Sequence, residues 1–355
     1  MKILLDAPFN SLSLGNVSYN VCRELFEKGH DVAVWPTSNN VNIDAYNATE
    51  EFKLKFKEAI DKRFDFLSKE IPVIKIWHLN GSEDRKNAKQ YLYTFYECNE
   101  PTDIERRLCN SQEKTIFSSS FAANQFDAEY IPLGFDKDFY KTNKTYLSNV
   151  THFGLMGKFE KRKHTGKIIQ QWIKKYGNNN KYQLTCCVNN PFFKDEEMSH
   201  IINATLNGER YTNVNILPYL KTNQEVNELL NAIDIDLTGL SGGEGWNLPA
   251  FNATCLGKWS VVLNATSHKD WANKDNAILV EPDGEISCED GKFFQKGSMF
   301  NQGTFYTWSE ESFNKAMEEA EDKARQTNTE GQKLADKFTY SKTVDAILAH
   351  ISKEN

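Results

Sequence analysis

Residues 2–35 read KILLDAPFNSLSLGNVSYNVCRELFEKGHDVAVW, and this stretch decides the fold class. An apolar run over 2–7 is followed by a polar segment and then by a helical pattern over about 17–28. Gly29 ends that pattern, and residues 31–35 form a second apolar run. A strand, a helix and a second strand in this order predict a βαβ unit, whose two strands lie parallel.

The same alternation of apolar runs and helical or polar stretches continues along the chain. In the first part we expect further strands over 71–79, 114–118 and 130–133. Residues 136–149 are polar without an amphipathic period, and we interpret them as an inter-domain linker. A second doubly wound sheet is predicted from the runs at 150–156, 182–188, 214–217, 233–237, 260–264 and 277–280. Helices over 310–325 and 343–351 are expected to close the chain.

Length and composition exclude several classes of protein. The chain has 355 residues, enough for about two domains. It is 39% hydrophobic and 12% aromatic, which supplies sizeable cores and excludes a disordered protein. No apolar run approaches the roughly 20 residues that span a bilayer. The formal net charge of -7 disfavours a general polyanion binder, because nucleic-acid affinity depends on basic surface.

The seven cysteines form an odd set without CxxC spacing. This pattern argues against both a disulfide framework and a zinc knuckle. A reducing compartment is the simpler interpretation, so we expect a cytoplasmic protein.

The segment LSGGEGWNLPAFNATCLG over 240–257 follows a predicted strand. Its glycines allow backbone to approach a ligand closely, Pro249 suits a first helical turn, and Gly257 suits the position after the last turn. The N–H groups at the start of such a helix attract phosphate or hydroxyl oxygens. Glu244 can accept hydrogen bonds from neutral hydroxyls. A diphosphate that carries a sugar satisfies both requirements.

The segment GLMGKFEKRKH over 154–164 leaves the first predicted strand of the second sheet. Four cations fall within six residues of it: Lys158, Lys161, Arg162 and Lys163. A solvated basic loop is one interpretation. The position after a strand end, at the crevice between two α/β domains, favours another, in which one or two of them neutralise a diphosphate leaving group.

Together these two segments resemble the donor-binding half of GT-B glycosyltransferases, specifically the retaining group-1 family called GT4. GLMGKFEKRKHTGKII is similar to the family's glycine-arginine-hydrophobic element and the lysine after it, with Lys158 and Lys163 at the two cations that bind the donor pyrophosphate. GEGWNLPAFNATCLGKWSVVLN is similar to E-G-F-G-L-P-x-L-E-A-x-A-x-G-x-P-V-V, so Glu244 falls on the first glutamate, which contacts the transferred sugar. Asn252 stands where the second glutamate holds the ribose, and Asn247 replaces a glycine.

The resemblance is looser over the first 140 residues. Gly15 and Asn16 lie in the loop after the first strand, where family members bring backbone amides to the donor phosphate and the acceptor; a simple tight turn is the alternative for Gly15. His78 resembles an acceptor-side histidine of the family. The alternative is a structural role for this side chain. The FYECNEP segment is similar to an F-E-x-x-x-x-P element, which places Glu97 or Glu100 near the cleft.

The resemblance implies a GT-B fold, in which two Rossmann-like, doubly wound domains face a central cleft. We expect an acceptor-side domain over 1–140, a nucleotide-sugar donor domain over 141–325, and C-terminal helices over 326–355 that pack back toward the first domain. The implied activity is transfer of a hexose from a UDP- or GDP-sugar with retention of configuration. No cofactor or metal is expected, because the Asp234-Ile-Asp236 letters alternate inside a predicted buried strand.

The catalytic residues expected from these motifs are Glu244, Lys163, Lys158 and His78. The expected donor-binding residues are Gly15, Asn16, Gly157, Gly243, Gly245, Trp246, Asn247, Leu248 and Asn252. The acceptor stays open between a glycan, a lipid-linked sugar, a protein and a modified nucleic acid. Two alternatives also stay open: a nucleotide-sugar or glycan-binding protein that has lost turnover, motivated by Asn252 and Lys158, and a GT-B sugar-nucleotide epimerase.

Overall fold

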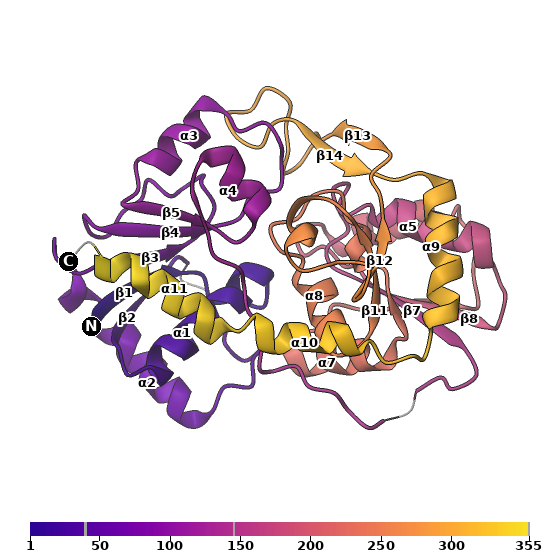
Figure 1. Cartoon of the computed structure of the whole chain (residues 1–355), viewed down its shortest axis with the longest axis horizontal. Helices are drawn as coiled ribbons and strands as arrows, with labels where there is room; N and C mark the ends of the chain where they lie inside the picture. Colours follow the sequence, from indigo (N-terminus) through magenta and orange to yellow (C-terminus); the bar gives the residue numbers. More distant parts are fainter. Residues whose placement is uncertain (39–40, 145, 354–355) are drawn as a thin grey trace.

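The computed structural model describes residues 1–38, 41–144 and 146–353 of the chain. Figure 1 shows two α/β halves side by side, each built around a parallel sheet of six strands. The first half is formed by the beginning of the chain and the second by residues from about 150 onward, while the last helix returns to the first half.

The first sheet has the strand order β2-β1-β3-β4-β5-β6. Its strands are β1 (Lys2–Ala7), β2 (Asp31–Pro36), β3 (Val73–Ile76), β4 (Gln90–Thr94), β5 (Lys114–Phe117) and β6 (Glu129–Tyr130). Its helices are α1 (Ser13–Glu27), α2 (Glu50–Asp61), α3 (Asp103–Asn110) and α4 (Ser120–Phe126). All of β1 after Lys2 is buried, which is expected for a parallel strand covered on both faces and explains its continuous apolar sequence.

The second sheet has the strand order β12-β11-β10-β7-β8-β9. Its strands are β7 (Thr151–Met156), β8 (Tyr182–Cys187), β9 (Val214–Ile216), β10 (Ile235–Asp236), β11 (Trp259–Leu263) and β12 (Ile278–Val280). The helices of this half are α5 (Thr165–Tyr176), α6 (Asp195–Thr205), α7 (Asn223–Ala232), α8 (Leu248–Cys255) and α9 (Glu310–Lys323). Helix α8 begins and ends where Pro249 and Gly257 predict, and Gly257 has a φ of 86°.

Each predicted apolar run overlaps a strand, and the predicted architecture of two doubly wound sheets is confirmed. The run expected over 130–133 pairs only as far as Tyr130, because Pro132 has no N–H to donate to the ladder. Strand β4 and an antiparallel hairpin of β13 (Gly284–Ser287) with β14 (Thr304–Thr307) were not predicted.

The described part of segment 136–149 contains no helix and no strand; Thr145 lies outside the described residues. Its first residues are nevertheless part of the protein interior. Asp136 and Asp138 are buried and form ion pairs with Arg23 of α1. The beginning of this connection is therefore fixed to the first sheet's helices.

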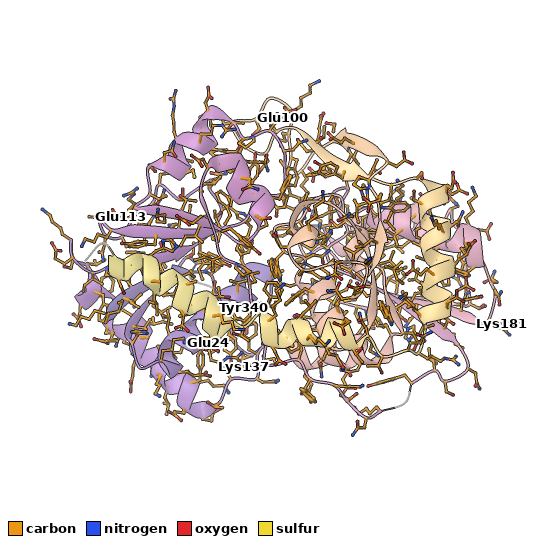
Figure 2. All side chains as sticks on the ribbon, in the orientation of Figure 1. Glu24, Glu100, Glu113, Lys137, Lys181 and Tyr340 are labelled. Atoms are coloured by element: carbon orange, nitrogen blue, oxygen red, sulfur yellow. The ribbon has the colours of Figure 1, made fainter. Side chains whose placement is uncertain are left out.

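The β13–β14 hairpin and its loop reach from the second half to the first (Figure 1). Glu100, labelled in Figure 2 beside this loop, forms a β-bridge with Gln302. The Asn99 amide donates to Thr304 Oγ1 at 2.8 Å, and the Asn301 N–H donates to Glu105 Oε1 at 2.8 Å. The hairpin loop thus joins the two halves on the side of α3.

Two further helices join the halves on the opposite side. Helix α10 (Thr329–Lys337) packs against α8, and α11 (Tyr340–Lys353) packs against α1. Residues 354 and 355 of the predicted C-terminal segment lie outside the described residues. Between the two helices, the Phe338 ring contacts the rings of Trp246 and Phe251, with centroids 5.5 and 5.9 Å away. One apolar core therefore extends from β1 and α1 into α8 and α10.

Candidate functional site

The predicted cations lie in the loop that joins β7 to α5. The N–H of Gly157 donates to the Cys187 carbonyl at 3.0 Å, and that of Phe159 donates to the Val188 carbonyl at 2.9 Å, so the loop follows the end of β8. Gly157 has a φ of 119°, a backbone conformation that glycine adopts without steric cost. The loop therefore begins at the carboxyl edge of the second sheet.

Lys158 lies at the outer side of this loop. Its Nζ is 2.8 Å from Glu160 Oε1, and its side chain keeps 32% of its surface exposed. The same Nζ lies 5.2 Å from the centroid of the Phe192 ring and 5.4 Å from that of Phe293. Both rings are exposed, so Lys158 meets solvent as well as two aromatic faces.

Arg162 is the most buried cation of the loop, with 8% of its side chain exposed. Its guanidinium lies 3.0 Å from Glu160 Oε2 and 3.0 Å from Glu244 Oε2, and it also donates to the Gly243 carbonyl. Burial alone would raise the pKa of Glu160, but the charges of Arg162 and Lys158 outweigh it and lower that pKa. The buried carboxylates are thus held in their charged form.

Lys163 shares Glu244 with Arg162. Its Nζ is 2.6 Å from Glu244 Oε1, so the two carboxylate oxygens have different cations. Burial would raise the pKa of Glu244; the charges of Arg162 and Lys163 and the hydrogen bond from Lys163 outweigh it, and the pKa lies well below its usual range. The predicted residues Lys158, Lys163 and Glu244 therefore come together in one cluster, with Arg162 and Glu160 between them.

The glycines of the loop before α8 are close to the first half of the molecule. A Cβ at Gly243 would lie 2.6 Å from the Glu97 carbonyl oxygen, and a Cβ at Gly245 would lie 2.9 Å from Phe95 Cβ. Ser118 Oγ donates to the Gly245 carbonyl at 2.7 Å. We expect these glycines to admit a ligand, but in this structure their close neighbours are the backbone and side chains that follow β4.

Asn247 and a buried histidine form the floor beside Glu244. Asn247 has a φ of 68°, and its amide nitrogen donates to the Thr238 carbonyl and to His268 Nε2. The His268 Nδ1–H donates to the Leu263 carbonyl at 2.9 Å, which leaves Nε2 as the acceptor. Complete burial lowers the pKa of His268 to about 4, so the ring is neutral at pH 7.

The other donor-binding predictions in this region fall at the start of α8 and within it. Trp246 is buried, and its ring packs in the core shared with α10. Leu248 is half-buried against the same core. Asn252 is buried within α8, and its carboxamide oxygen has no hydrogen-bond partner among the described residues.

His78 follows β3 and is exposed to solvent. The surrounding protein nevertheless lowers its pKa, mainly through desolvation; Glu97 opposes this shift, while Lys158 and Arg162 add to it. Because Glu97, Lys158 and Arg162 all act on the pKa of His78, its side chain lies beside the charged cluster. At neutral pH its imidazole is uncharged.

Gly15 and Asn16 were expected in the loop after the first strand, but they are the third and fourth residues of α1. A Cβ at Gly15 would lie 2.1 Å from the Asn10 carbonyl oxygen, so glycine is needed for the close approach of α1 to the segment before it. The Asn16 amide nitrogen donates to Asp136 Oδ2 at 2.8 Å. The side chain of Asn16 thus belongs to the cluster around Arg23 and Asp136.

Three site residues were missed by the sequence reasoning. Arg162 was one of four neighbouring cations, and nothing in its position distinguished it from the lysines. The acidic residue Glu160, two positions before Arg162, is the feature of the sequence that could have indicated an ion pair within the loop. His268 had no signal, because its contact with Asn247 joins residues 21 apart across the sheet edge.

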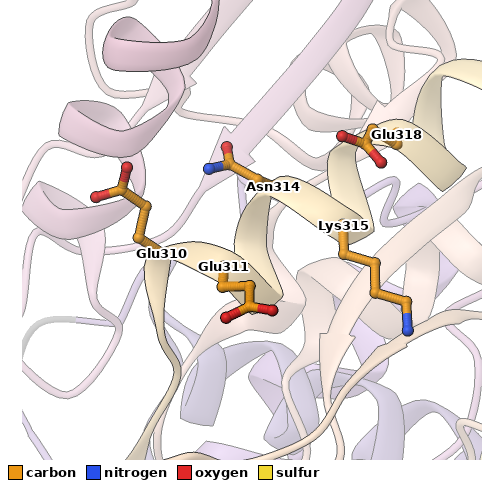
Figure 3. Close-up of a pocket in the computed structure, with 5 residues that line it drawn as sticks. All are labelled: Glu310, Glu311, Asn314, Lys315 and Glu318. Carbon is orange, nitrogen blue, oxygen red and sulfur yellow. The ribbon is translucent and has the colours of Figure 1, made fainter.

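A hollow of about 540 Å³ lies elsewhere, on the outer face of α9 (Figure 3). It is lined by Glu310, Glu311, Asn314, Lys315 and Glu318. Three carboxylates and one lysine make this surface acidic, so it repels a diphosphate. None of the residues predicted for the site lines this hollow, and the Arg162 cluster remains the candidate site.

Over residues 1–38, 41–144 and 146–353, no group of three or more His, Cys, Asp or Glu side chains is arranged to hold a metal ion. Within the same ranges no helix is long and apolar enough to cross a membrane. Asp236, one of the two aspartates flanking Ile235, is buried in β10, and burial raises its pKa to about 6. All seven cysteines are buried free thiols.

No protein-family model matches the chain, and no curated protein shows a significant match. Solved structures match it along its whole length. A glycosyltransferase from Rickettsia africae has a TM-score of 0.67 at 12% identity, over 99% of this chain and 98% of that chain. The chain has the GT-B fold.

Two other GT-B structures are similar to the same degree. Sucrose-phosphate synthase from Thermosynechococcus elongatus has a TM-score of 0.66 at 11% identity, over 100% of this chain and 98% of that chain. HepE from Anabaena in complex with UDP-glucose has a TM-score of 0.65 at 13% identity, over 99% of this chain and 100% of that chain. At such identities the likeness establishes the GT-B fold expected from the motifs, and the chemistry has to be argued from the site.

Proposed function

We propose that this GT-B protein transfers a hexose from a nucleotide-sugar donor to an acceptor, with retention of anomeric configuration and without a metal ion. The supporting observation is the cluster of Lys158, Arg162 and Lys163 around two buried carboxylates at the end of β7. Ligands of open α/β sheets bind at the carboxyl ends of the strands. HepE, which has the same fold, was crystallised with UDP-glucose.

The lysines supply the charge that the leaving group requires. A nucleoside diphosphate gains negative charge as the bond to the sugar breaks, and preorganised cations lower the barrier for that step. Lys158 and Lys163 are both partly exposed at the strand end, so a bound diphosphate can reach them. Each is worth about 2–4 kcal/mol of transition-state stabilisation.

Glu244 and His78 are assigned to the sugar and the acceptor. The lowered pKa of Glu244 keeps it ionised, and an ionised carboxylate accepts hydrogen bonds from sugar hydroxyls. His78 projects from the first domain as an exposed, neutral imidazole, which can bond to an acceptor hydroxyl. In this proposal residues 141–325 bind the donor and residues 1–140 bind the acceptor.

Retention in this proposal does not use a carboxylate nucleophile. Retaining hydrolases place two carboxylates about the scissile bond, one of them free to attack the sugar. Here Glu160 and Glu244 are both bound by Arg162, and each has a lysine as a second partner. We assign acceptor attack to the face that the diphosphate leaves, with a phosphate oxygen taking the acceptor's proton.

The test compares two neighbouring lysines. Calorimetric titration with UDP-, GDP- and ADP-sugars identifies the donor, and Lys163→Ala is then assayed against it. Loss of about 2–4 kcal/mol predicts a fall in kcat/KM of roughly 30- to 1000-fold. Lys161→Ala is the matched control, because Lys161 Nζ donates to the Glu289 carbonyl outside the cluster.

Wild-type turnover in the Lys163→Ala protein contradicts the assigned role. NMR of the products with the identified donor separates the remaining possibilities: a new glycosidic bond of unchanged configuration supports the proposal. An inverted bond refutes retention, an epimerised nucleotide sugar indicates an epimerase, and tight binding without any product indicates a binding protein.

A further inference from the structure

Two cations hold the same carboxylate from opposite oxygens. Lys163 Nζ lies 2.6 Å from Glu244 Oε1, and the Arg162 guanidinium lies 3.0 Å from Glu244 Oε2. A lysine that binds a diphosphate must give up all or part of its existing ion pair. The question is therefore what happens to Glu244 when Lys163 turns to the donor.

The two cations are held very differently. Arg162 is 8% exposed and has three acceptors at once: Glu160 Oε2, Glu244 Oε2 and the Gly243 carbonyl. Its planar guanidinium matches such a set of acceptors, and moving it would break all three contacts. Lys163 is 13% exposed, and its flexible four-carbon stem passes beside Gly157 to a single carboxylate. Lys163 is the cation that can move.

Removal of every cation from a buried carboxylate is strongly unfavourable. If Lys163 moves while Arg162 stays, Glu244 keeps a charged partner at Oε2. The Gly243 carbonyl also stays in place, and with it the loop that contacts Glu97 of the first domain. Arg162 therefore lowers the cost of redirecting Lys163.

We infer that Arg162 is a positioning residue, which holds Glu244 and the Gly243 carbonyl while Lys163 exchanges Glu244 for the diphosphate of the donor. This inference rests on the proposed function, because it deepens the role of the same site. Arg162 acts through its two partners and does not itself contact the donor. No covalent bond changes in this step; one ion pair replaces another.

The exchange makes a prediction about pairs of variants. In Arg162→Gln, Lys163 is the remaining cation paired with Glu244, so it cannot turn to a diphosphate without leaving that carboxylate unpaired. UDP, GDP and inorganic pyrophosphate should therefore bind at least about tenfold more weakly by calorimetry. Adding Glu244→Gln frees Lys163, and the double variant should return to within about threefold of the wild-type affinity. Lys161→Gln, in the same loop, is the matched control for loss of a cation and should bind as the wild type does.

Two results would overturn the inference: wild-type affinity in Arg162→Gln, or a double variant as weak as Arg162→Gln. A merely structural role for Arg162 would lower Tm in both backgrounds without the rescue. Arg162→Lys covers the case in which Arg162→Gln does not fold. It keeps the charge but not the planar fork, so it should bind at least about threefold more weakly, again with rescue by Glu244→Gln; wild-type affinity here also overturns the inference.

The three probes separate this inference from the proposed function. Pyrophosphate binding with the predicted rescue, but no binding of UDP or GDP, supports the exchange and contradicts a UDP- or GDP-sugar donor. Binding of none of the three probes to the wild-type protein contradicts both.

Discussion

Two regions of the molecule use the same device, an arginine between two buried carboxylates. In one, Arg162 lies between Glu160 and Glu244 at the end of β7. In the other, Arg23 of α1 lies between Asp136 and Asp138 at the start of the connection between the sheets. Their surroundings differ, and the difference separates a binding site from a structural joint.

The charge balance differs first. Among the described residues, ion pairs in the Arg162 cluster add Lys158 and Lys163 to the arginine, three cations for two carboxylates. In the part of the chain that the structure describes, the Arg23 cluster has one cation for two carboxylates. Accordingly the pKa of Glu244 is lowered, whereas that of Asp136 is raised, by burial first and by its neighbouring carboxylate second. Only the first cluster has positive charge to offer to an anion.

The neutral partners differ as well. The carboxylates of the Arg23 cluster accept hydrogen bonds from the side-chain amides of Asn16, in α1, and Asn223, at the start of α7. These bonds tie α1, the connection and α7 together. The cluster is saturated with donors from the protein itself, so we interpret it as the joint between the two halves.

The largest effect that tests this comparison is expected from Arg23→Ala. It leaves two buried carboxylates without a cation, and loss of one partner from a buried ion pair costs about 3–5 kcal/mol of unfolding free energy. Arg162→Ala should cost at least about 1 kcal/mol less, because Lys158 and Lys163 still compensate the carboxylates. Urea denaturation of both variants measures the two losses.

Arg107→Ala, at an exposed arginine of α3, is the control and should change the free energy of unfolding by less than about 0.5 kcal/mol. Equal losses at Arg23 and Arg162 would show that the extra lysines contribute nothing, and the proposed distinction between joint and site would fail.

The two clusters are also expected to differ in how the free energy of unfolding changes as the pH falls. His268 lies beside the Arg162 cluster, and burial lowers its pKa from 6.5 to about 4. Between those values the unfolded chain binds a proton that the folded chain does not, so stability is full above pH 6.5 and falls as the pH drops toward 4. This one histidine accounts for about 3 kcal/mol of that loss. Asp136 has the opposite sign, because its raised pKa favours folding as it becomes protonated.

Unfolding free energies of the wild type and His268→Gln, measured from pH 7.5 to pH 4, test this. Glutamine can still donate to Leu263 and accept from Asn247 without titrating in this range, so the difference between the two proteins isolates the imidazole. His200→Gln removes an exposed imidazole and is the control. Parallel pH profiles for the wild type and His268→Gln would contradict the expectation.

The parts of the fold and of the candidate site that were predictable are those set by residues close together in the sequence. The strands and α8 were predictable because apolar runs, Pro249 and Gly257 act on their own neighbours in the chain. The gathering of cations was predictable from their spacing within one loop. Which of them is buried was not, because that depends on the turn of the loop, set by Gly157 with a φ of 119° and His164 with a φ of 53°.

Contacts between the two halves could not be predicted from the pattern of apolar and polar residues. Gly243 lies against Glu97, and the Asn223 amide donates to Asp136 across 87 residues; both contacts depend on how two separately folded sheets dock. The β13–β14 hairpin was missed for a different reason. Its strands have four residues each and are separated by a loop of irregular sequence, so the period-two pattern is too short to be recognised.

The smallest effect is expected from an ion pair that is as short as those of the two clusters but is not buried. Lys174 Nζ lies 2.5 Å from Glu310 Oε1, closer than Arg162 lies to either carboxylate, yet the two side chains are 63% and 44% exposed. Water and salt screen such a pair, so a double-mutant cycle with Lys174→Ala and Glu310→Ala should give a coupling energy below about 0.5 kcal/mol.

The coupling energy between Lys174 and Glu310 should fall further in 1 M NaCl, where the screening length is about 3 Å. A coupling above about 1.5 kcal/mol would mean that short distance alone makes a strong pair; the contrast between the two arginine clusters would then have to be re-derived from geometry, since burial and charge balance would no longer explain it.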